Sequence, residues 1–106
     1  MIVLYEDEFS NRLAQLRNQK GVSARDMSLS IGQNAGYINN IESGKAMPSM
    51  GCFFFICDYL NISPSEFFDI DNKNPEKLNT IIEDLKMLDE SQFDNISAIV
   101  KGLIKK

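Results

Sequence analysis

The chain has 106 residues, a formal net charge of −4 at pH 7, 43% hydrophobic residues and 25% charged residues. This composition is typical of a folded globular protein, and the length suffices for one domain with one core, or for one domain with a small appendage. No apolar run approaches the roughly 20 residues that cross a membrane, and the start, "MIVLYEDEF", lacks the basic region and long apolar core of a signal peptide.

The composition also argues against catalysis and metal binding. The chain has no histidine, and its two cysteines, Cys52 and Cys57, lie five residues apart in the run "CFFFIC". Zinc sites need more ligands than this, and on a helix the spacing puts the two thiols on different faces. No P-loop, dinucleotide fingerprint or G-x-S-x-G motif occurs. We therefore expect a cytoplasmic protein that is not an enzyme, holds no metal or cofactor, and keeps its cysteines reduced.

Helices are expected along nearly the whole chain, beginning with three amphipathic segments. The first carries an apolar stripe at the spacing of one helical face and ends before Gly21: Phe9, Leu13 and Leu16. The second is expected after the cap residue Ser23 and before Gly32. The third is expected from the cap residue Asn34 to Gly44.

Two further helices are expected next. The segment at residues 49–60, with Ser49 as its candidate cap, is the most apolar, so we expect it to be surrounded by other elements and to form the floor of the core. In "SPSEFF", Ser63 is a cap residue, Pro64 occupies the first helical position, and Glu66 follows three residues after the cap. This capping-box arrangement predicts a short fifth helix.

The polar break "DIDNKNP" at residues 69–75 is the one linker-like segment. After it, two helices carry apolar residues at helical spacing: Leu78, Ile81, Ile82, Leu85 and Leu88, and then Phe93, Ile96, Ile99, Val100, Leu103 and Ile104. The short connection between them predicts an antiparallel hairpin. The expected organisation is a helical domain at residues 9–69, a linker at 70–74 and a C-terminal two-helix hairpin at 75–106.

The second and third helices fit a helix-turn-helix. Apolar residues lie where the two helices face one another, and the small Ser28 lies where they come closest. Gly32 occupies the turn, where glycine most easily adopts a positive φ. Taken alone, these features also fit other glycine-joined helix pairs in small bundles.

The surrounding residues make the motif more specific. The segment "RLAQLRNQKGVSARDMSLSIGQNAGYINNIESGKAMPS" and its continuation "FFFICDYLNISPSEFFD" resemble the phage-repressor and Cro-type helix-turn-helix family, also called the xenobiotic-response-element family. The resemblance runs from about Arg12 to Phe68, just over half of the chain. It implies an all-α, five-helix repressor-like DNA-binding domain, usually bound to two half-sites as a dimer, and a bacterial or phage origin.

Members of that family pair an arginine late in the first helix with a glutamate late in the third. Arg17 and Glu42 stand at these positions, and "SGK" follows. A planar guanidinium can donate two parallel hydrogen bonds to a carboxylate, so this salt bridge would tie the first helix to the third. The alternative is two separately solvated charges.

The third helix would read bases with its N-terminal residues and outer face if it enters a major groove. Placing Ile38 and Ile41 inward turns Gly36, Asn39, Asn40 and Ser43 outward. Together with the family's base-reading positions, this gives the expected base contacts Asn34, Ala35, Gly36, Asn39 and Asn40. Asparagine can bond an adenine edge and alanine can touch a thymine methyl, but Ala35 and Gly36 are short, so DNA shape would supply part of the specificity.

The DNA-backbone contacts expected from the resemblance are Ser23, Ala24, Arg25, Gln33, Tyr37, Ser43 and Lys45. Two alternatives stay open for the polar residues of this region. Asn39 and Asn40 would also fit an ordinary solvated face, and Tyr37 would also fit a partly exposed packing residue.

The acidic net charge is unevenly distributed. Residues 10–50 carry five basic and two acidic side chains, a net of +3, whereas residues 1–9 contribute −3 and residues 51–106 contribute −4. Residues 10–50 can therefore attract DNA phosphates, while the acidic remainder of the chain is repelled by them. Because this surplus is modest, one copy would bind weakly, which favours a homodimer joined by the C-terminal hairpin. The alternative is a hairpin packed on its own chain.

The sequence thus predicts a sequence-specific DNA-binding transcription regulator, a repressor, which binds an operator in double-stranded DNA as a homodimer. One alternative is a protein-interaction module that keeps the fold with little or no base readout. Another is an antitoxin that combines DNA binding with a protein partner held by the C-terminal hairpin.

Overall fold

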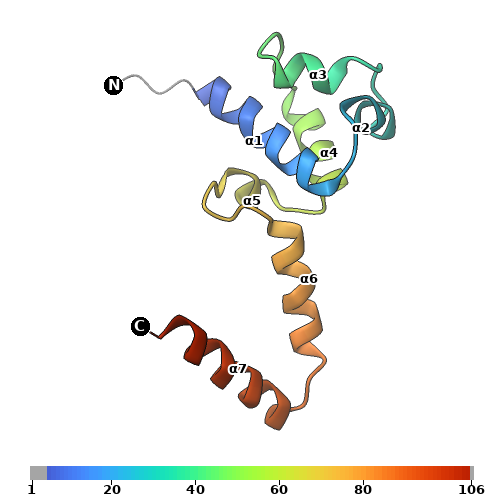
Figure 1. Ribbon diagram of the computed structural model, residues 1–106. Coiled ribbons are helices and arrows are strands. Elements are labelled where there is room, and N and C mark those ends of the chain that lie inside the picture. Colours follow the sequence, from blue (N-terminus) through green and yellow to red (C-terminus); the bar gives the residue numbers. More distant parts are fainter. Residues whose placement is uncertain (1–4, 106) are drawn as a thin grey trace. The chain divides into compact units, whose positions relative to one another are not determined.

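The computed structural model describes residues 5–105, which form seven helices and no strand (Figure 1). The helices are α1 (Tyr5–Lys20), α2 (Ala24–Ser30), α3 (Tyr37–Glu42), α4 (Met50–Leu60), α5 (Pro64–Phe68), α6 (Pro75–Lys86) and α7 (Glu90–Ile104). The predicted all-α fold is confirmed. The signal-peptide argument rests partly on residues 2–4, which lie outside the described residues. Between residues 5 and 105, no helix is both long enough and apolar enough to span a membrane.

Serine caps set the starts of three helices where the sequence predicts them. Ser23, Ser49 and Ser63 each accept a hydrogen bond from the backbone N–H three residues further on, at 3.0–3.1 Å. Ser63 and Glu66 also form the predicted capping box, in which the Glu66 carboxylate accepts from the Ser63 N–H at 2.9 Å. These bonds satisfy backbone donors that the helix itself leaves without partners.

The predicted cap of α3 is wrong. Asn34 Oδ1 accepts a hydrogen bond from the Gly36 N–H at 3.1 Å, so Asn34 closes a turn ahead of the helix. The helix begins at Tyr37, and Gly36 at its cap position has no side chain to accept a bond. Asparagine readily bonds its own backbone two residues on, and this local turn competes with helix capping.

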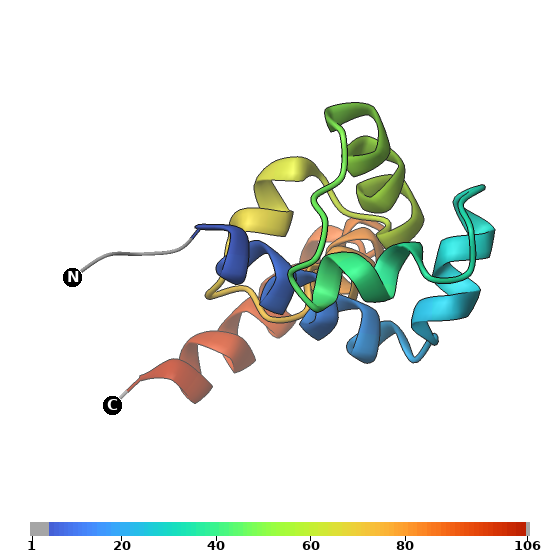
Figure 2. The same ribbon diagram turned by 90° about the horizontal axis from the view of Figure 1, so that it is seen from above.

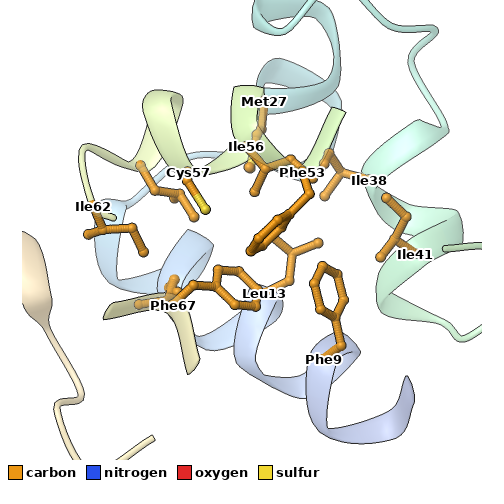
Figure 3. Packing of buried hydrophobic residues seen from close by; sticks show 12 residues of the cluster. Phe9, Leu13, Met27, Ile38, Ile41, Phe53, Ile56, Cys57, Ile62 and Phe67 are labelled. Atoms are coloured by element: carbon orange, nitrogen blue, oxygen red, sulfur yellow. The ribbon is translucent and has the colours of Figure 1, made fainter. Parts of the chain in front are cut away.

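In the N-terminal unit, which ends at Glu76, buried apolar side chains of the described residues form one cluster. α1 packs against α3, α4 and α5, and α2 packs against α3 (Figure 1, Figure 2). Figure 3 shows Phe53 of α4 between side chains of the other helices. Its ring centroid lies 5.6 Å from that of Phe9 on α1 and 5.1 Å from that of Phe67 on α5, the latter edge-to-face. These aromatic contacts hold α1, α4 and α5 together behind the helix-turn-helix.

α4 is not surrounded, contrary to the sequence expectation. Four of its residues face the core: Phe53, Ile56, Cys57 and Leu60. Phe54 and Phe55, by contrast, are 52% and 61% exposed. Successive residues of a helix point about 100° apart, so the residues directly after Phe53 cannot share its face. A continuous apolar run therefore did not mean burial on every side.

The C-terminal unit begins at Lys77 and contains the rest of α6, together with α7. α7 starts with a capping box in which Asp89 and Gln92 exchange hydrogen bonds with each other's backbone N–H groups. Both predicted helices are present, but they diverge from their connection instead of lying along one another as in a closed hairpin (Figure 1). Their apolar residues accordingly stay exposed: Leu78, Ile81, Ile82, Phe93, Ile96, Ile99, Val100, Leu103 and Ile104.

Candidate nucleic-acid interface

The candidate interface is built on α2, the turn after it, and α3. Gly32 has φ +80°, the left-handed conformation that the turn requires. The backbone N–H of Gln33 closes the turn by donating to the Ser28 carbonyl at 2.9 Å. Ile38 and Ile41 are fully buried, as the motif predicts. With these side chains inward, the opposite face of α3 is turned to solvent.

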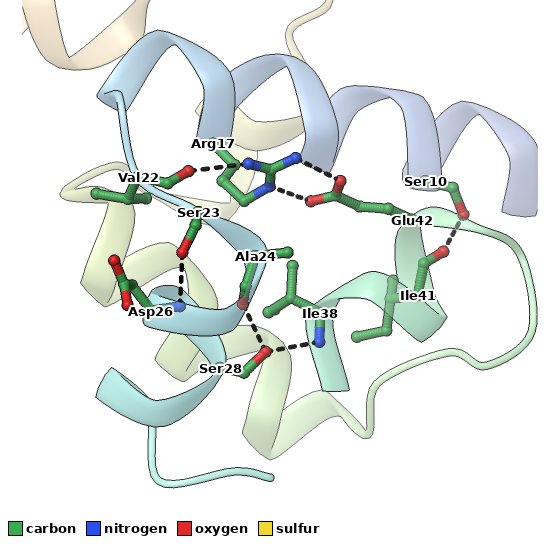
Figure 4. Close-up of polar contacts among 10 residues, drawn as sticks. All are labelled: Ser10, Arg17, Val22, Ser23, Ala24, Asp26, Ser28, Ile38, Ile41 and Glu42. Atoms are coloured by element: carbon green, nitrogen blue, oxygen red, sulfur yellow. Dashed lines mark hydrogen bonds and ion pairs between the residues drawn. The ribbon is translucent and has the colours of Figure 1, made fainter. Parts of the chain in front are cut away.

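Ser28 joins α2 to the start of α3 (Figure 4). Its hydroxyl donates to the Ala24 carbonyl at 2.7 Å and accepts from the Ile38 N–H at 2.9 Å. Ser28 is fully buried, and Gly36 offers no side-chain cap, so this hydroxyl supplies the acceptor that the first turn of α3 needs. The sequence explained Ser28 only by its small size.

We expect Ser28→Ala to lower the free energy of unfolding by about 1–3 kcal/mol, because it leaves the buried Ile38 N–H without an acceptor. Urea unfolding followed by circular dichroism measures this change. Ser30→Ala, on the exposed side of the same helix, is the matched control and should change the free energy by less than about 0.5 kcal/mol. Equal effects of the two substitutions would show that Ser28 has no such role.

Arg17 and Glu42 form the salt bridge that the sequence predicts (Figure 4). Arg17 Nε and Nη2 donate to the two carboxylate oxygens of Glu42 at 2.6 and 2.9 Å, and Nη1 donates to the Val22 carbonyl at 2.8 Å. The hydrogen bond with Glu42 raises the pKa of the Arg17 guanidinium, against the opposing effect of burial. A second tie is the Ser10 hydroxyl, which donates to the Ile41 carbonyl at 2.7 Å. Together these bonds fix α3 to α1 and to the turn before α2.

The predicted base-contact residues lie together at the start and on the outer face of α3. Asn34, Gly36, Asn39 and Asn40 are exposed, and Ala35 is half-buried. The turn uses the side-chain carbonyl of Asn34, which leaves its amide NH₂ as the group that can reach a base edge. In the described part of the chain, no hydrogen bond engages the side-chain amide of Asn39 or Asn40, so both amides can donate and accept. Their contacts with bases stay predictions.

The predicted backbone contacts divide into two groups. Four are exposed: Ser23, Arg25, Ser43 and Lys45. Ala24, Gln33 and Tyr37 are half-buried. The hydroxyl of Ser23 is occupied as a helix cap, and that of Ser43 donates to the Asn40 carbonyl at 3.2 Å. Arg25 and Lys45 are therefore the members of the set that present charge directly to solvent.

Gln33 and Tyr37 both lie next to Cys52, which is a free, half-buried cysteine. Gln33 Nε2 donates to Cys52 Sγ at 3.4 Å, and Tyr37 also interacts electrostatically with this thiol. Burial and then the interaction with Cys52 raise the pKa of Tyr37 to about 12, so its hydroxyl stays protonated. Bonds with Ser49 and then Tyr37 lower the pKa of Cys52, whereas burial raises that of Cys57 to about 11. The contact of Tyr37 with a DNA phosphate stays a prediction.

Most of the basic side chains behind the net charge of +3 at residues 10–50 are buried or paired, and so are not available to DNA. Arg12 is 2% exposed and bonded to protein groups, Arg17 is paired with Glu42, and Lys20 lies 3.3 Å from a carboxylate oxygen of Glu76. Arg25 and Lys45 remain exposed, with Asp26 beside Arg25. The accessible surplus is thus two positive charges less one negative charge, a net of +1. The sequence count was misleading because it ignored pairing and burial.

Comparison with known proteins decides the family. A family model described as a helix-turn-helix domain matches residues 10–73, more than half of the chain. The chain belongs to the helix-turn-helix family. A similar solved structure is the restriction-modification controller protein C.AhdI from Aeromonas hydrophila, with 28% sequence identity and a TM-score of 0.56, covering 59% of this chain and 91% of that one. No match was found among curated proteins.

The chain is thus a helix-turn-helix DNA-binding protein. The matched residues include α2, α3 and the exposed asparagines of the candidate interface. The match ends at residue 73, before α6 begins at Pro75. Around this domain, sequence reasoning missed Ser10 and Arg12, and it missed the hydrogen bonds that Ser28 and Cys52 make. Arg12 was the one with a detectable signal, because it lies three residues after Phe9 and so on the same helical stripe.

Proposed function

We propose that this helix-turn-helix protein is a transcription repressor that binds a two-half-site operator as a homodimer, within the cytoplasm. The observation that carries the proposal is the exposed polar face of α3, held against α1 and α2 by Glu42 and by the buried Ser28. A rigid helix with free amides on its outer face is what major-groove readout needs. The likeness to a controller of restriction-modification supports a role in gene control.

In this proposal, readout comes mainly from asparagine amides. Asn34, Asn39 and Asn40 would hydrogen-bond base edges, with adenine as the best-suited partner. Ala35 and Gly36 would let the backbone of the turn approach the groove closely, which makes shape and deformability of the site part of the specificity. Arg25 and Lys45 would contact phosphates and set the register without reading sequence.

The C-terminal unit offers a surface for the second copy. We define the C-terminal seam as eight apolar residues that recur with spacings of three, four and three in each of two segments: Leu78, Ile81, Leu85 and Leu88, and Phe93, Ile96, Val100 and Leu103. This repeat is that of helices packed along a common seam. Two copies would bring four such segments together, as in a four-helix bundle.

Magnitudes favour this assembly. Burying an apolar side chain contributes about 1.5–3 kcal/mol when it starts fully exposed, and the seam residues start partly exposed. At half that value, the sixteen side chains of two copies contribute roughly 12–24 kcal/mol. Association costs roughly 4–15 kcal/mol. The seam is therefore large enough to hold a dimer.

Phosphate contacts at Arg25 and Lys45 predict a defined salt dependence. We expect Arg25→Gln and Lys45→Gln each to reduce the slope of log Kd against log salt by about one, while base preference stays unchanged. Fluorescence anisotropy with a labelled duplex at several salt concentrations measures the slope. Lys86→Gln, an exposed lysine of α6, is the control and should leave the slope as it is. Unchanged slopes for both interface variants would remove these residues from the interface.

Selection from random duplex DNA by the purified protein, at low and then physiological salt, tests the function. Enrichment of a palindrome is expected, and the distance between its halves reports the geometry of the dimer. Transcription of a reporter placed behind the selected site then separates repression from activation. No enrichment at either salt, from folded protein, would overturn the proposal.

One observation favours a second candidate, a protein-interaction module. Only one net positive charge is accessible in the helix-turn-helix segment, which is little for a protein that binds a polyanion. The selection experiment separates the two, because an interaction module would show no salt-sensitive DNA binding.

A further inference from the structure

Two adjoining hollows lie on the N-terminal unit, where α1 meets the end of α5 and the segment after it. The larger has a volume of about 380 Å³, within the range of small-molecule sites, and the smaller has a volume of about 80 Å³. Glu8, Arg12 and Ile70 line both of them, so the two form one continuous depression, which we call the α1–α5 hollow. None of the residues that line it is a predicted DNA contact.

The wall that α1 contributes to this hollow is polar. Four residues spaced by three, one and three positions line it from one face of the helix: Glu8, Asn11, Arg12 and Gln15. The Glu8 carboxylate is exposed, and among residues 5–105 no hydrogen bond or ion pair engages it. It can therefore accept a hydrogen bond from a donor on a ligand.

N–H donors lie further along the same wall. Gln15 Oε1 accepts from Arg12 Nη1 at 2.8 Å, which leaves the Gln15 NH₂ group to donate elsewhere. Nη1 carries two N–H groups and makes no other hydrogen bond within the described part of the chain, so its second N–H is also available. Burial lowers the pKa of this guanidinium, against the opposing charge of Asp69. An anionic group placed beside these donors would therefore be stabilised.

The remaining lining of the hollow is largely apolar. Ile70 borders both parts, and three aromatic side chains border the smaller part: Tyr5, Phe9 and Phe68. The ring centroid of Phe68 lies 6.2 Å from that of the buried Phe9, but Phe68 itself is mostly exposed. Tyr5 and Ile70 are exposed as well. Exposed apolar side chains that border a hollow provide a surface for an apolar group of a ligand.

The segment that the sequence predicted as a linker is held in place beside the hollow. Arg12 Nη2 donates to the carbonyls of Asp69 and Asn72 at 2.9 and 2.8 Å, one on each side of Ile70 in the chain. Two further hydrogen bonds join Arg12 to carbonyls at the end of α5. A lining fixed in this way needs little ordering when a ligand binds, so the hollow is preorganised.

We propose that the α1–α5 hollow binds an α-amino acid with an apolar side chain. The Glu8 carboxylate accepts from the ammonium group of the ligand. The Gln15 NH₂ group and the available N–H of Arg12 donate to its carboxylate. Its apolar side chain lies against Ile70 and Phe68. The inference stands apart from the proposed function, because the hollow shares no residue with the outer face of α3.

The size of such a ligand suits the wall. Glu8 and Gln15 are seven residues apart, which corresponds to a rise of about 10 Å along the helix. The two charged groups of an α-amino acid lie roughly 3 Å apart and, with a hydrogen bond of about 2.9 Å at each end, bridge roughly 9 Å. One ligand molecule can therefore engage both ends of the polar wall at once.

The test titrates the isotope-labelled, full-length protein with L-phenylalanine and follows the backbone amides by NMR. Three analogues each lack one feature of the ligand: phenethylamine lacks the carboxylate, phenylpropionate lacks the ammonium group, and glycine lacks the apolar side chain. We expect L-phenylalanine to cause saturable shifts at residues 5–15 and 66–72. Each analogue should bind about 10-fold more weakly or worse, because it loses one of the three interactions.

Two variants separate the two charged ends. Glu8→Gln should weaken the binding of L-phenylalanine and of phenethylamine by about 10-fold, because both present an ammonium group. Gln15→Glu keeps an acceptor for Arg12 but replaces the NH₂ donor by an anionic oxygen, so it should weaken L-phenylalanine alone. Glu6→Gln is the control, since Glu6 is an exposed acid of the same first turn of α1 and lies outside the hollow.

Three results would overturn the inference, and none of them bears on DNA binding. In the first, L-phenylalanine causes no saturable shifts, or causes them away from the α1–α5 hollow. In the second, phenethylamine binds the wild-type protein as tightly as L-phenylalanine does, which would show that the carboxylate is not recognised. In the third, Glu8→Gln binds L-phenylalanine as well as Glu6→Gln does.

Discussion

Ile96→Glu in the full-length chain is expected to make the protein monomeric and to lower its affinity for a two-half-site operator by about 10²-fold or more, the gain that two linked half-sites supply. Ile96 lies in the C-terminal seam on α7, so a carboxylate there would have to be desolvated on association. Affinity for a duplex with one half-site should stay unchanged, because Ile96 lies outside the helix-turn-helix. Sedimentation velocity and anisotropy titrations measure the two effects.

The neighbouring residue provides the control. Asn95→Glu adds the same charge to the same helix, on an exposed position outside the C-terminal seam. We expect this variant to remain a dimer with normal operator affinity. If Ile96→Glu also remains a dimer, the second copy does not dock on the C-terminal seam.

Glu42→Ala is expected to lower the free energy of unfolding by about 2–3 kcal/mol. Exposed ion pairs contribute about 0–1 kcal/mol, whereas removing one partner of a buried pair costs about 3–5 kcal/mol. The side chains of Arg17 and Glu42 are 15% and 12% exposed, which places this pair between the two limits. For a domain of this size, the midpoint of thermal unfolding should fall by roughly 10–20 °C, with native helix content retained below the transition.

A second glutamate in an ion pair serves as the control. Glu83 pairs with Lys86 within α6 at 3.1 Å, and both side chains are more than 60% exposed. Glu83→Ala should change the free energy of unfolding by less than about 0.5 kcal/mol. If Glu42→Ala proves as mild as Glu83→Ala, the bidentate bond does not stabilise the junction of α1 and α3.

Local sequence was a good guide to most helix boundaries in this chain. Ser23, Ser49 and Ser63 cap helices where they were predicted to do so, because a capping hydroxyl and its acceptor N–H lie within three residues. The turn at Gly32 was predictable for the same reason, since a positive φ is a property of one residue. The failure at Asn34 is also local, because two short-range bonds were available to the same side chain.

By itself, the sequence therefore determined the all-α fold, the helix-turn-helix and the Arg17–Glu42 pair, since periodicity, caps and a recognisable motif encode them. Only the tertiary structure decided which charged and polar side chains are engaged in hydrogen bonds or ion pairs within the protein. Arg12 meets carbonyls 54 to 60 residues away, Lys20 meets Glu76, and Ser28 caps a helix ten residues later. Such contacts depend on how the helices pack around the core, and neither spacing nor composition records which distant group a side chain will reach.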